Sequence, residues 1–172
     1  MSKLIFITGG ARSGKSAFAE RLAADAAGKR AYLATAQALD AEMVRRIELH
    51  RRRRGDAWDT FEEPLAIAEL VGKLAGRYRM VLLDCLTLWL SNVMARSERD
   101  SEITDKVEEL AAALRAFDGT LLAVSNEVGL GIVPDNPLAR RFRDLAGFLN
   151  QRIAREADEA YFLAAGLPLK IK

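Results

Sequence analysis

The sequence contains a single cysteine, Cys85, among 172 residues. A lone cysteine excludes an internal disulfide and fits a reducing compartment. Long hydrophobic runs are also missing. No stretch approaches the roughly 20 apolar residues of a membrane span, and the early run "LIFI" is too short for a signal-peptide core. The net charge is only +2, which argues against general affinity for nucleic acid or membranes. We therefore expect a soluble cytoplasmic protein.

Repeats, low-complexity tracts and linkers are absent too. The sequence instead alternates between strand-like and helix-like patterns. Short apolar runs predict buried strands, which we place at residues 3–8, 30–35, 79–85, 120–125 and 159–165. Helical patterns between them predict an α/β fold, with a mostly parallel sheet and helices on both faces. One domain over residues 1–172 accounts for the pattern.

Four helices are expected between these strands. The first spans 15–27 and the second begins near Asp40. The third spans 101–117, with Ser101 as N-cap and Gly119 as its stop signal. The fourth opens at Asn136-Pro137. Its apolar stripe consists of Leu138, Phe142, Leu145, Leu149 and Ile153. The very apolar stretch 86–94 is either buried core or a contact between subunits.

The stretch "GGARSGKS" carries the strongest functional signal. It follows the first strand and precedes the first helix, as the phosphate-binding Walker A pattern requires. Its backbone N–H groups can converge on an anion, Lys15 can reach the β- and γ-phosphates, and the Ser16 hydroxyl can ligate Mg²⁺. The candidate nucleotide ligands from this loop are Gly9, Gly10, Ala11, Arg12, Ser13, Gly14, Lys15 and Ser16.

Besides the Walker A loop, such a site needs an acidic group near the Mg²⁺. Asp84 ends the apolar run "VLLD", where a Walker B carboxylate belongs. Ser16 and Asp84 are therefore the candidate metal residues. These features predict a site for a purine nucleoside triphosphate with Mg²⁺, but they leave ATP and GTP open. The absence of an N-K-x-D run argues against a regulatory GTPase.

His50 is the only histidine, and it lies in a basic run with six arginines between residues 45 and 54. Three interpretations remain open on the residues alone. The run can be a solvated basic face, with His50 as a half-buried filler. It can grip a nucleic-acid backbone, although no aromatic residue is interleaved before Trp58. It can also hold a reactive imidazole, whose pKa the flanking guanidiniums lower while they neutralise phosphates.

Several segments together resemble one family. They are "GGARSGKS", "YLATAQALDAEMVRRIELHRRRRGDAW", "TFEEP", "VLLDCLTLWLSN" and "SNEVGLGIVPDNPLARRFRDLAGFLNQRIA". In order and spacing they are similar to the bifunctional adenosylcobinamide kinase / adenosylcobinamide-phosphate guanylyltransferase family of cobalamin biosynthesis. The resemblance runs from Leu4 to the closing "LPLKIK".

The resemblance implies a RecA-like P-loop NTPase domain, a homotrimer and two reactions. The first phosphorylates the aminopropanol hydroxyl of adenosylcobinamide with ATP or GTP. The second transfers GMP from GTP to that phosphate, giving adenosylcobinamide-GDP and pyrophosphate. His50 matches the histidine that carries the GMP, so His50 and Lys15 are the catalytic candidates.

The resemblance also implies nucleotide contacts outside the loop. They are Ala34, Thr35, Ala36, Arg51, Arg52, Arg53, Arg54, Glu62 and Asp84, with Glu63 as the alternative to Glu62. The long non-helical segment "SNEVGLGIVPDNP" is expected to close the site, to cover the corrinoid, or to form a surface excursion. Two rival functions remain: a simple P-loop kinase for another small alcohol, which would not need His50, and a non-enzymatic nucleotide-dependent interaction module.

Overall fold

The computed structural model describes the chain except for residues 1, 25, 27, 38–44 and 46–56. The described strands are β1 (Lys3–Gly9), β2 (Arg30–Ala34), β3 (Asp59–Glu62), β4 (Met80–Asp84), β5 (Thr120–Val124), β6 (Glu159–Ala164) and β7 (Leu167–Lys170). The described helices are α1 (Lys15–Ala24), α3 (Ile67–Leu74), α4 (Leu86–Met94), α5 (Asp100–Ala116) and α6 (Pro137–Glu156). The predicted helix near Asp40 lies outside the described residues.

All seven of these strands form one sheet in the order β3-β2-β4-β5-β1-β6-β7. Every neighbouring pair is parallel except β6 and β7, which form an antiparallel hairpin at one edge. The α/β fold with a mostly parallel sheet is therefore confirmed. The parallel strands also bring the ends of β1, β2, β4 and β5 to a single edge, where the predicted phosphate loop and Asp84 lie.

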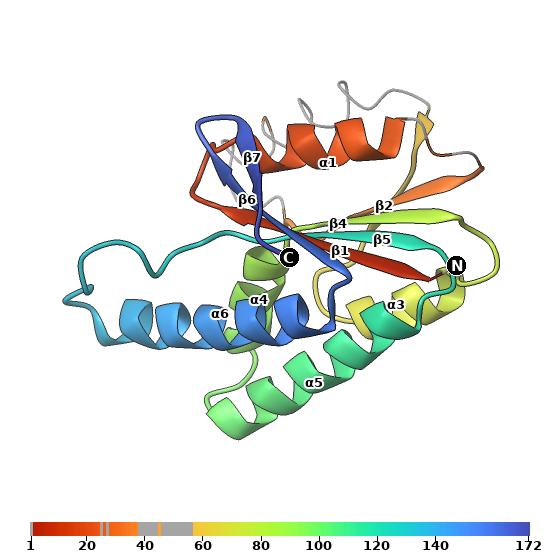
Figure 1. Ribbon diagram of the computed structural model, residues 1–172. Helices are drawn as coiled ribbons and strands as arrows, with labels where there is room; N and C mark the ends of the chain where they lie inside the picture. The colour runs from red at the N-terminus through yellow and green to blue at the C-terminus, as the bar shows by residue number, and fades with distance from the viewer. Residues whose placement is uncertain (1, 25, 27, 38–44, 46–56) are drawn as a thin grey trace.

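Helices cover both faces of this sheet, as Figure 1 shows, with α1 on one side and α3 to α6 on the other. The strands alternate between two cores because neighbouring side chains point to opposite faces. In β1, Leu4 and Phe6 join the core under α3 to α6. Ile5 and Ile7 join the core under α1. The predicted burial on both faces is confirmed for β1, β2, β4 and β5, whereas β6 is only partly buried.

Two helix ends differ from the sequence prediction. Helix α5 begins at Asp100 after Arg99, so Ser101 is not its N-cap. Ser97 and Arg99 hold this end instead, because both contact the Glu102 carboxylate. The same helix ends at Ala116, before Gly119. Gly119 has a different role: a Cβ on it would lie 2.5 Å from the Arg79 carbonyl oxygen, so the close approach of two strand-entry segments needs a glycine.

The prediction of the helix that opens at Asn136-Pro137 is largely confirmed. The Asn136 side chain accepts a hydrogen bond from the Ala139 N–H and caps α6, with Pro137 in the first turn. Leu145, Leu149 and Ile153 are buried. Leu138 is wrong as a member of that stripe, since it is 63% exposed where α6 projects beyond the sheet edge.

The apolar stretch 86–94 forms α4, and its main apolar residues, Leu86, Trp89, Leu90 and Val93, are buried within the chain. The buried-core alternative is therefore the right one for these side chains. No described helix combines the length and apolarity that crossing a bilayer requires.

Candidate active site

The phosphate loop joins β1 to α1 at the carboxyl edge of the sheet. Its backbone passes through conformations that favour glycine, with φ of 149° at Gly9 and 94° at Gly14, and Arg12 also has a positive φ of 58°. A Cβ on Gly9 would lie 2.4 Å from the Leu163 carbonyl oxygen of β6. The Gly166 N–H also donates to the Ser13 carbonyl oxygen at 3.0 Å. The β6–β7 hairpin therefore packs against the loop and supports its backbone.

Lys15 is folded into this loop. Only 7% of the residue is exposed, and its Nζ donates a 2.6 Å hydrogen bond to the Gly10 carbonyl oxygen. Among the described residues, the buried hydroxyls of Ser13 and of Thr8 on β1 have no hydrogen-bond partner. Buried polar atoms are normally satisfied, so orphaned hydroxyls in and beside this loop point to a polar ligand or ordered water.

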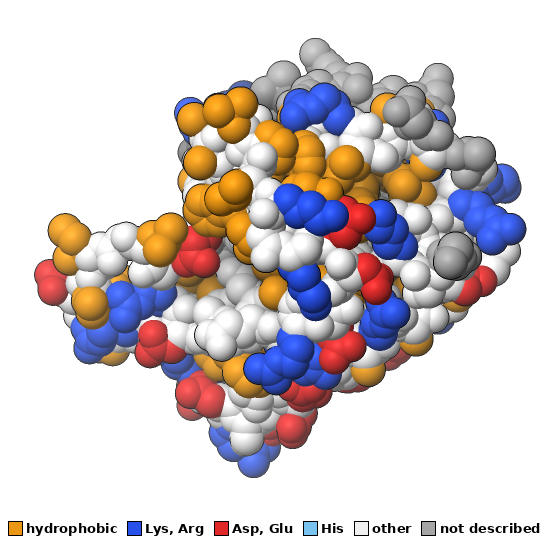
Figure 2. All heavy atoms as spheres, viewed as in Figure 1, with side chains coloured by type: hydrophobic (Ala, Val, Ile, Leu, Met, Phe, Trp, Pro, Cys, Tyr) orange, Lys and Arg blue, Asp and Glu red, His pale blue; other side chains and the backbone are white. Residues whose placement is uncertain are grey.

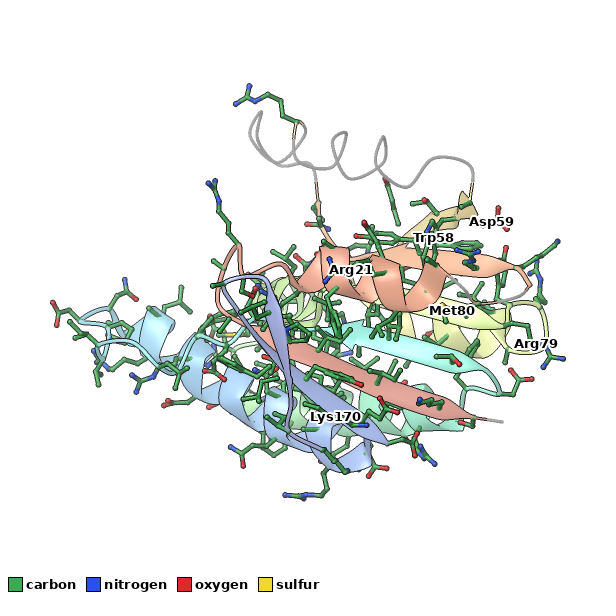
Figure 3. All side chains as sticks on the ribbon, turned by 45° about the horizontal axis from the view of Figure 1, so that its top comes forward. Arg21, Trp58, Asp59, Arg79, Met80 and Lys170 are labelled. Atoms are coloured by element: carbon green, nitrogen blue, oxygen red, sulfur yellow. The ribbon has the colours of Figure 1, made fainter. Side chains whose placement is uncertain are left out.

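Asp84 faces the loop from the end of β4. Its Oδ2 accepts hydrogen bonds from the Ser16 hydroxyl at 2.7 Å and from the Tyr32 phenol at 2.9 Å. The Tyr32 ring packs edge-on against Trp58, with ring centroids 6.3 Å apart. Figure 3 shows Trp58 near the β3 edge of the sheet, far from Lys170 at the hairpin edge. The structure thus brings together the two predicted metal residues, Ser16 and Asp84, and Tyr32 fixes the carboxylate.

Thr35 and Cys85 form a buried bracket beside this carboxylate. The Thr35 hydroxyl donates to the Cys85 carbonyl oxygen at 2.8 Å and accepts from the Cys85 N–H at 2.9 Å. Asn92 of α4 donates to the Thr35 carbonyl oxygen at 2.9 Å. The Thr35 side chain therefore holds the end of β4 in place. Ala34 and Ala36, the other two residues predicted from this segment, are half-buried beside it.

Cys85 is no candidate nucleophile. Burial and the neighbouring Asp84 carboxylate raise the pKa of its thiol, which keeps the sulfur protonated. Its Sγ lies 3.3 Å from the Thr87 hydroxyl.

A polar network at the end of β5 continues this arrangement, and sequence reasoning missed it. The Ser125 hydroxyl donates to Asn150 Oδ1 of α6 at 2.6 Å, and Asn150 Nδ2 donates to the Asn126 carbonyl oxygen at 3.0 Å. Asn126 Nδ2 donates to the Thr87 hydroxyl at 2.9 Å. The start of segment 125–136 is therefore fixed to both α4 and α6. Asn150, buried within a helix stripe, was the available signal, because a buried amide must find partners.

The two glutamates at the end of β3 have different environments. Glu63 is half-buried, and its Oε1 accepts hydrogen bonds from the N–H groups of Leu65 and Ala66 at 2.9 Å. It therefore organises the turn into α3. Glu62 is exposed at the carboxyl edge of the sheet.

The remaining predicted residues lie largely outside this description. His50 and Arg51 to Arg54 are not among the described residues. Of the basic run, only Arg45 is described, and it is exposed.

Nearly the whole chain is similar to known proteins of one kind. Residues 5–171 match the family described as cobinamide kinase / cobinamide phosphate guanyltransferase. The bifunctional adenosylcobalamin biosynthesis protein CobP of Pseudomonas aeruginosa is 48% identical over 166 residues, covering 96% of this chain and 95% of that protein. The CobU proteins of Salmonella typhimurium and Escherichia coli are 41% and 39% identical, and each comparison covers 98% of this chain and 99% of the relative.

Among solved structures, a KaiC-like protein from Pyrococcus horikoshii matches with a TM-score of 0.54. The match covers 95% of this chain and 71% of that one at 12% sequence identity. At this identity the likeness concerns the fold alone, and it agrees with the predicted RecA-like P-loop architecture.

Proposed function

The chain belongs to the cobinamide kinase / cobinamide phosphate guanyltransferase family. From this premise we propose that it catalyses two reactions, and we assign roles in them to its residues. In the first, adenosylcobinamide is phosphorylated on its aminopropanol hydroxyl by ATP or GTP. In the second, GMP from GTP is joined to that phosphate, which gives adenosylcobinamide-GDP and releases pyrophosphate. The observation that carries the proposal is a phosphate loop facing Asp84, within a chain that matches the family almost end to end.

The phosphate loop serves both reactions. Lys15 exchanges its bond to the Gly10 carbonyl oxygen for the β- and γ-phosphates, and the loop N–H groups and the hydroxyl of Ser13 surround the anion. The oxygen donors of Ser16 and Asp84, 2.7 Å apart, fit Mg²⁺, which commonly binds one or two protein oxygens together with nucleotide phosphates. When bound, this ion neutralises charge on the phosphates.

The transfer of GMP proceeds through His50. A neutral imidazole nitrogen attacks the α-phosphorus of GTP, the bond to the bridging oxygen breaks, and pyrophosphate leaves with the electron pair. The phosphate oxygen of adenosylcobinamide phosphate then displaces the imidazole and takes up the GMP. A covalent relay divides one difficult displacement into two easier ones. His50 is the only histidine in the sequence, so no other imidazole can take this role. The arginines at 51–54 and Glu62 contact the nucleotide beside it.

Mass spectrometry after incubation with GTP tests the relay directly. We expect a guanylyl adduct on His50, and we expect His50→Ala to lose both this adduct and adenosylcobinamide-GDP while it keeps phosphorylation. His50→Asn is the matched control for the size of the side chain. Phosphorylation without an adduct or GMP transfer in the wild type would instead identify a simple kinase. Nucleotide binding without any product would indicate an interaction module.

We also place the corrinoid at the projecting segment 125–136 and expect a cytoplasmic homotrimer. Leu130 and Ile132 of this segment are 81% and 97% exposed, and Leu167 of the hairpin is 72% exposed. Figure 2 shows apolar side chains at the projecting end of the molecule, with a concave notch between that end and the main body. Such surfaces serve a large ligand or a second subunit. Light scattering with and without adenosylcobinamide separates these roles.

A further inference from the structure

The kinase half of the proposed function needs a proton acceptor, and this inference rests on that function. An alcohol attacking the γ-phosphorus must lose its proton, and kinases place a carboxylate beside the hydroxyl for this purpose. Among the described residues, four carboxylates lie at or near the carboxyl ends of β3, β4 and β5. They are Glu62, Glu63, Asp84 and Glu127.

Three of these four are committed elsewhere or lie too far from the phosphate loop. Asp84 accepts hydrogen bonds from both Ser16 and Tyr32. Glu63 accepts two backbone hydrogen bonds at the entrance to α3. Glu62 belongs to β3, four strands away from β1 in the sheet order. At a strand spacing of about 4.8 Å, this amounts to about 19 Å.

Glu127 is placed differently. It follows β5, the strand paired directly with β1, and its own N–H donates a 3.0 Å hydrogen bond to the carbonyl oxygen of Gly9. The backbone of Glu127 therefore touches the first residue of the phosphate loop. Since β5 lies between β1 and β4, Glu127 also lies between the loop and the strand of Asp84.

The residues around Glu127 hold it firmly. The preceding pair, Ser125 and Asn126, is bonded to α6 and α4 through Asn150 and Thr87. The Glu127 side chain is half-buried, and its Oε1 accepts a 2.5 Å hydrogen bond from the Gly129 N–H. A carboxylate has further lone pairs, so this bond orients the group and leaves it able to accept a proton.

We propose that Glu127 is the general base of the kinase reaction. The aminopropanol hydroxyl oxygen of adenosylcobinamide forms a bond to the γ-phosphorus as its proton passes to the Glu127 carboxylate. The bond from the γ-phosphorus to the β,γ-bridging oxygen breaks, and the electron pair leaves with the nucleoside diphosphate, which Lys15 holds. The transfer of GMP starts from a phosphate that is already deprotonated, so it does not need this base.

Glu127→Gln isolates the proposed role, because a glutamine carbonyl can still accept from the Gly129 N–H but is no base. We expect phosphorylation of adenosylcobinamide to slow at least about 100-fold. Nucleotide affinity, measured by calorimetry, and GMP transfer to synthetic adenosylcobinamide phosphate should stay near wild type. Glu109→Gln, which makes the same substitution at an exposed position of α5 outside the site, is the matched control. Glu127→Asp restores a carboxylate and should recover part of the rate.

Two results would overturn the assignment. One is a kinase rate for Glu127→Gln within about threefold of that of Glu109→Gln, since a general base contributes far more than this. The other is a joint loss of nucleotide binding and both reactions, which indicates a structural residue. A wild-type enzyme that makes no phosphorylated product refutes the proposed function itself and is recognised before any variant is compared.

Discussion

The Ser16 hydroxyl donates a 2.7 Å hydrogen bond to Asp84 Oδ2, which joins the first turn of α1 to the end of β4 across 68 positions of sequence. The two oxygens face each other because β1 and β4 run parallel and end at the same sheet edge. Tyr32 holds the same carboxylate oxygen from β2. Two hydrogen bonds from different elements therefore fix the position of this carboxylate, and such preorganisation lowers the cost of ordering the site.

Asp84→Asn should lower the turnover of both reactions by roughly 100-fold or more, since the amide keeps the shape but loses the charge. The loss should be largest at low Mg²⁺ concentration. Steady-state assays across a magnesium series provide the measurement. Asp105→Asn, on the exposed face of α5, is the control for removing one negative charge. Equal magnesium dependence in both variants would contradict a metal role for Asp84.

Lys15→Ala should abolish measurable binding of GTP and ATP. The ammonium group is the only described side-chain cation folded into the phosphate loop, and charge-assisted bonds to phosphate are the strongest available there. Titration calorimetry measures the affinity, and circular dichroism checks that the variant is folded. Lys106→Ala on exposed α5 should bind like the wild type. Undiminished binding by Lys15→Ala would remove this loop from the mechanism.

Much of the fold was predictable because buried parallel strands are short apolar runs. Five strands and the helices α1, α5 and α6 followed from this pattern, whereas α3 was not predicted. Strand β3 was not predicted because "DTFE" has one apolar side chain and is largely exposed. Strand β7 escaped because its apolar residues are exposed at the sheet edge. Helix α4 has six apolar residues among its nine, and so short an apolar run does not separate a buried helix from a strand.

The phosphate loop and Asp84 were predictable because their chemistry depends on local spacing and on a strand end. The network of Ser125, Asn126 and Asn150 was not, because its members are joined by sheet order and by the return of α6. The environments of Glu62 and Glu63 were equally hidden, since only the turn into α3 distinguishes adjacent glutamates. His50 stays a prediction from sequence resemblance.

Thr35→Val should destabilise the protein by about 2–3 kcal/mol, because it leaves the Cys85 N–H and carbonyl buried without their partner. Thr35→Ser keeps the hydroxyl and should cost less, about 1 kcal/mol for the lost methyl group. Chemical denaturation measures both. If Val and Ser variants were equally stable, the bracket would contribute nothing to folding.

Acid should weaken the edge formed by β1, β6 and β7. Hydrogen bonds from Lys3 and then Tyr161 lower the pKa of Glu159 to about 2. Because the folded-state pKa lies below the ordinary 4.5, its contribution is present above about pH 4.5 and is lost as the pH falls towards 2. Glu159→Gln should remove about 1 kcal/mol at neutral pH and flatten the stability profile across that acid window. An unchanged slope in denaturation at pH 2–5 would contradict this.

Gly9→Ala should be among the most damaging single methyl additions in the chain. Its Cβ would lie 2.4 Å from the Leu163 carbonyl oxygen, and its φ of 149° is strained for alanine. Relieving either conflict requires a shift of the backbone of the loop or of β6, which costs free energy. We expect a loss of about 2–4 kcal/mol in unfolding free energy and weaker nucleotide binding. Gly147→Ala is the matched control, since a Cβ there meets nothing within 4 Å and Gly147 lies inside α6. It should stabilise by up to about 1 kcal/mol through helix propensity. Equal effects of the two substitutions in denaturation would mean that β6 does not support the phosphate loop.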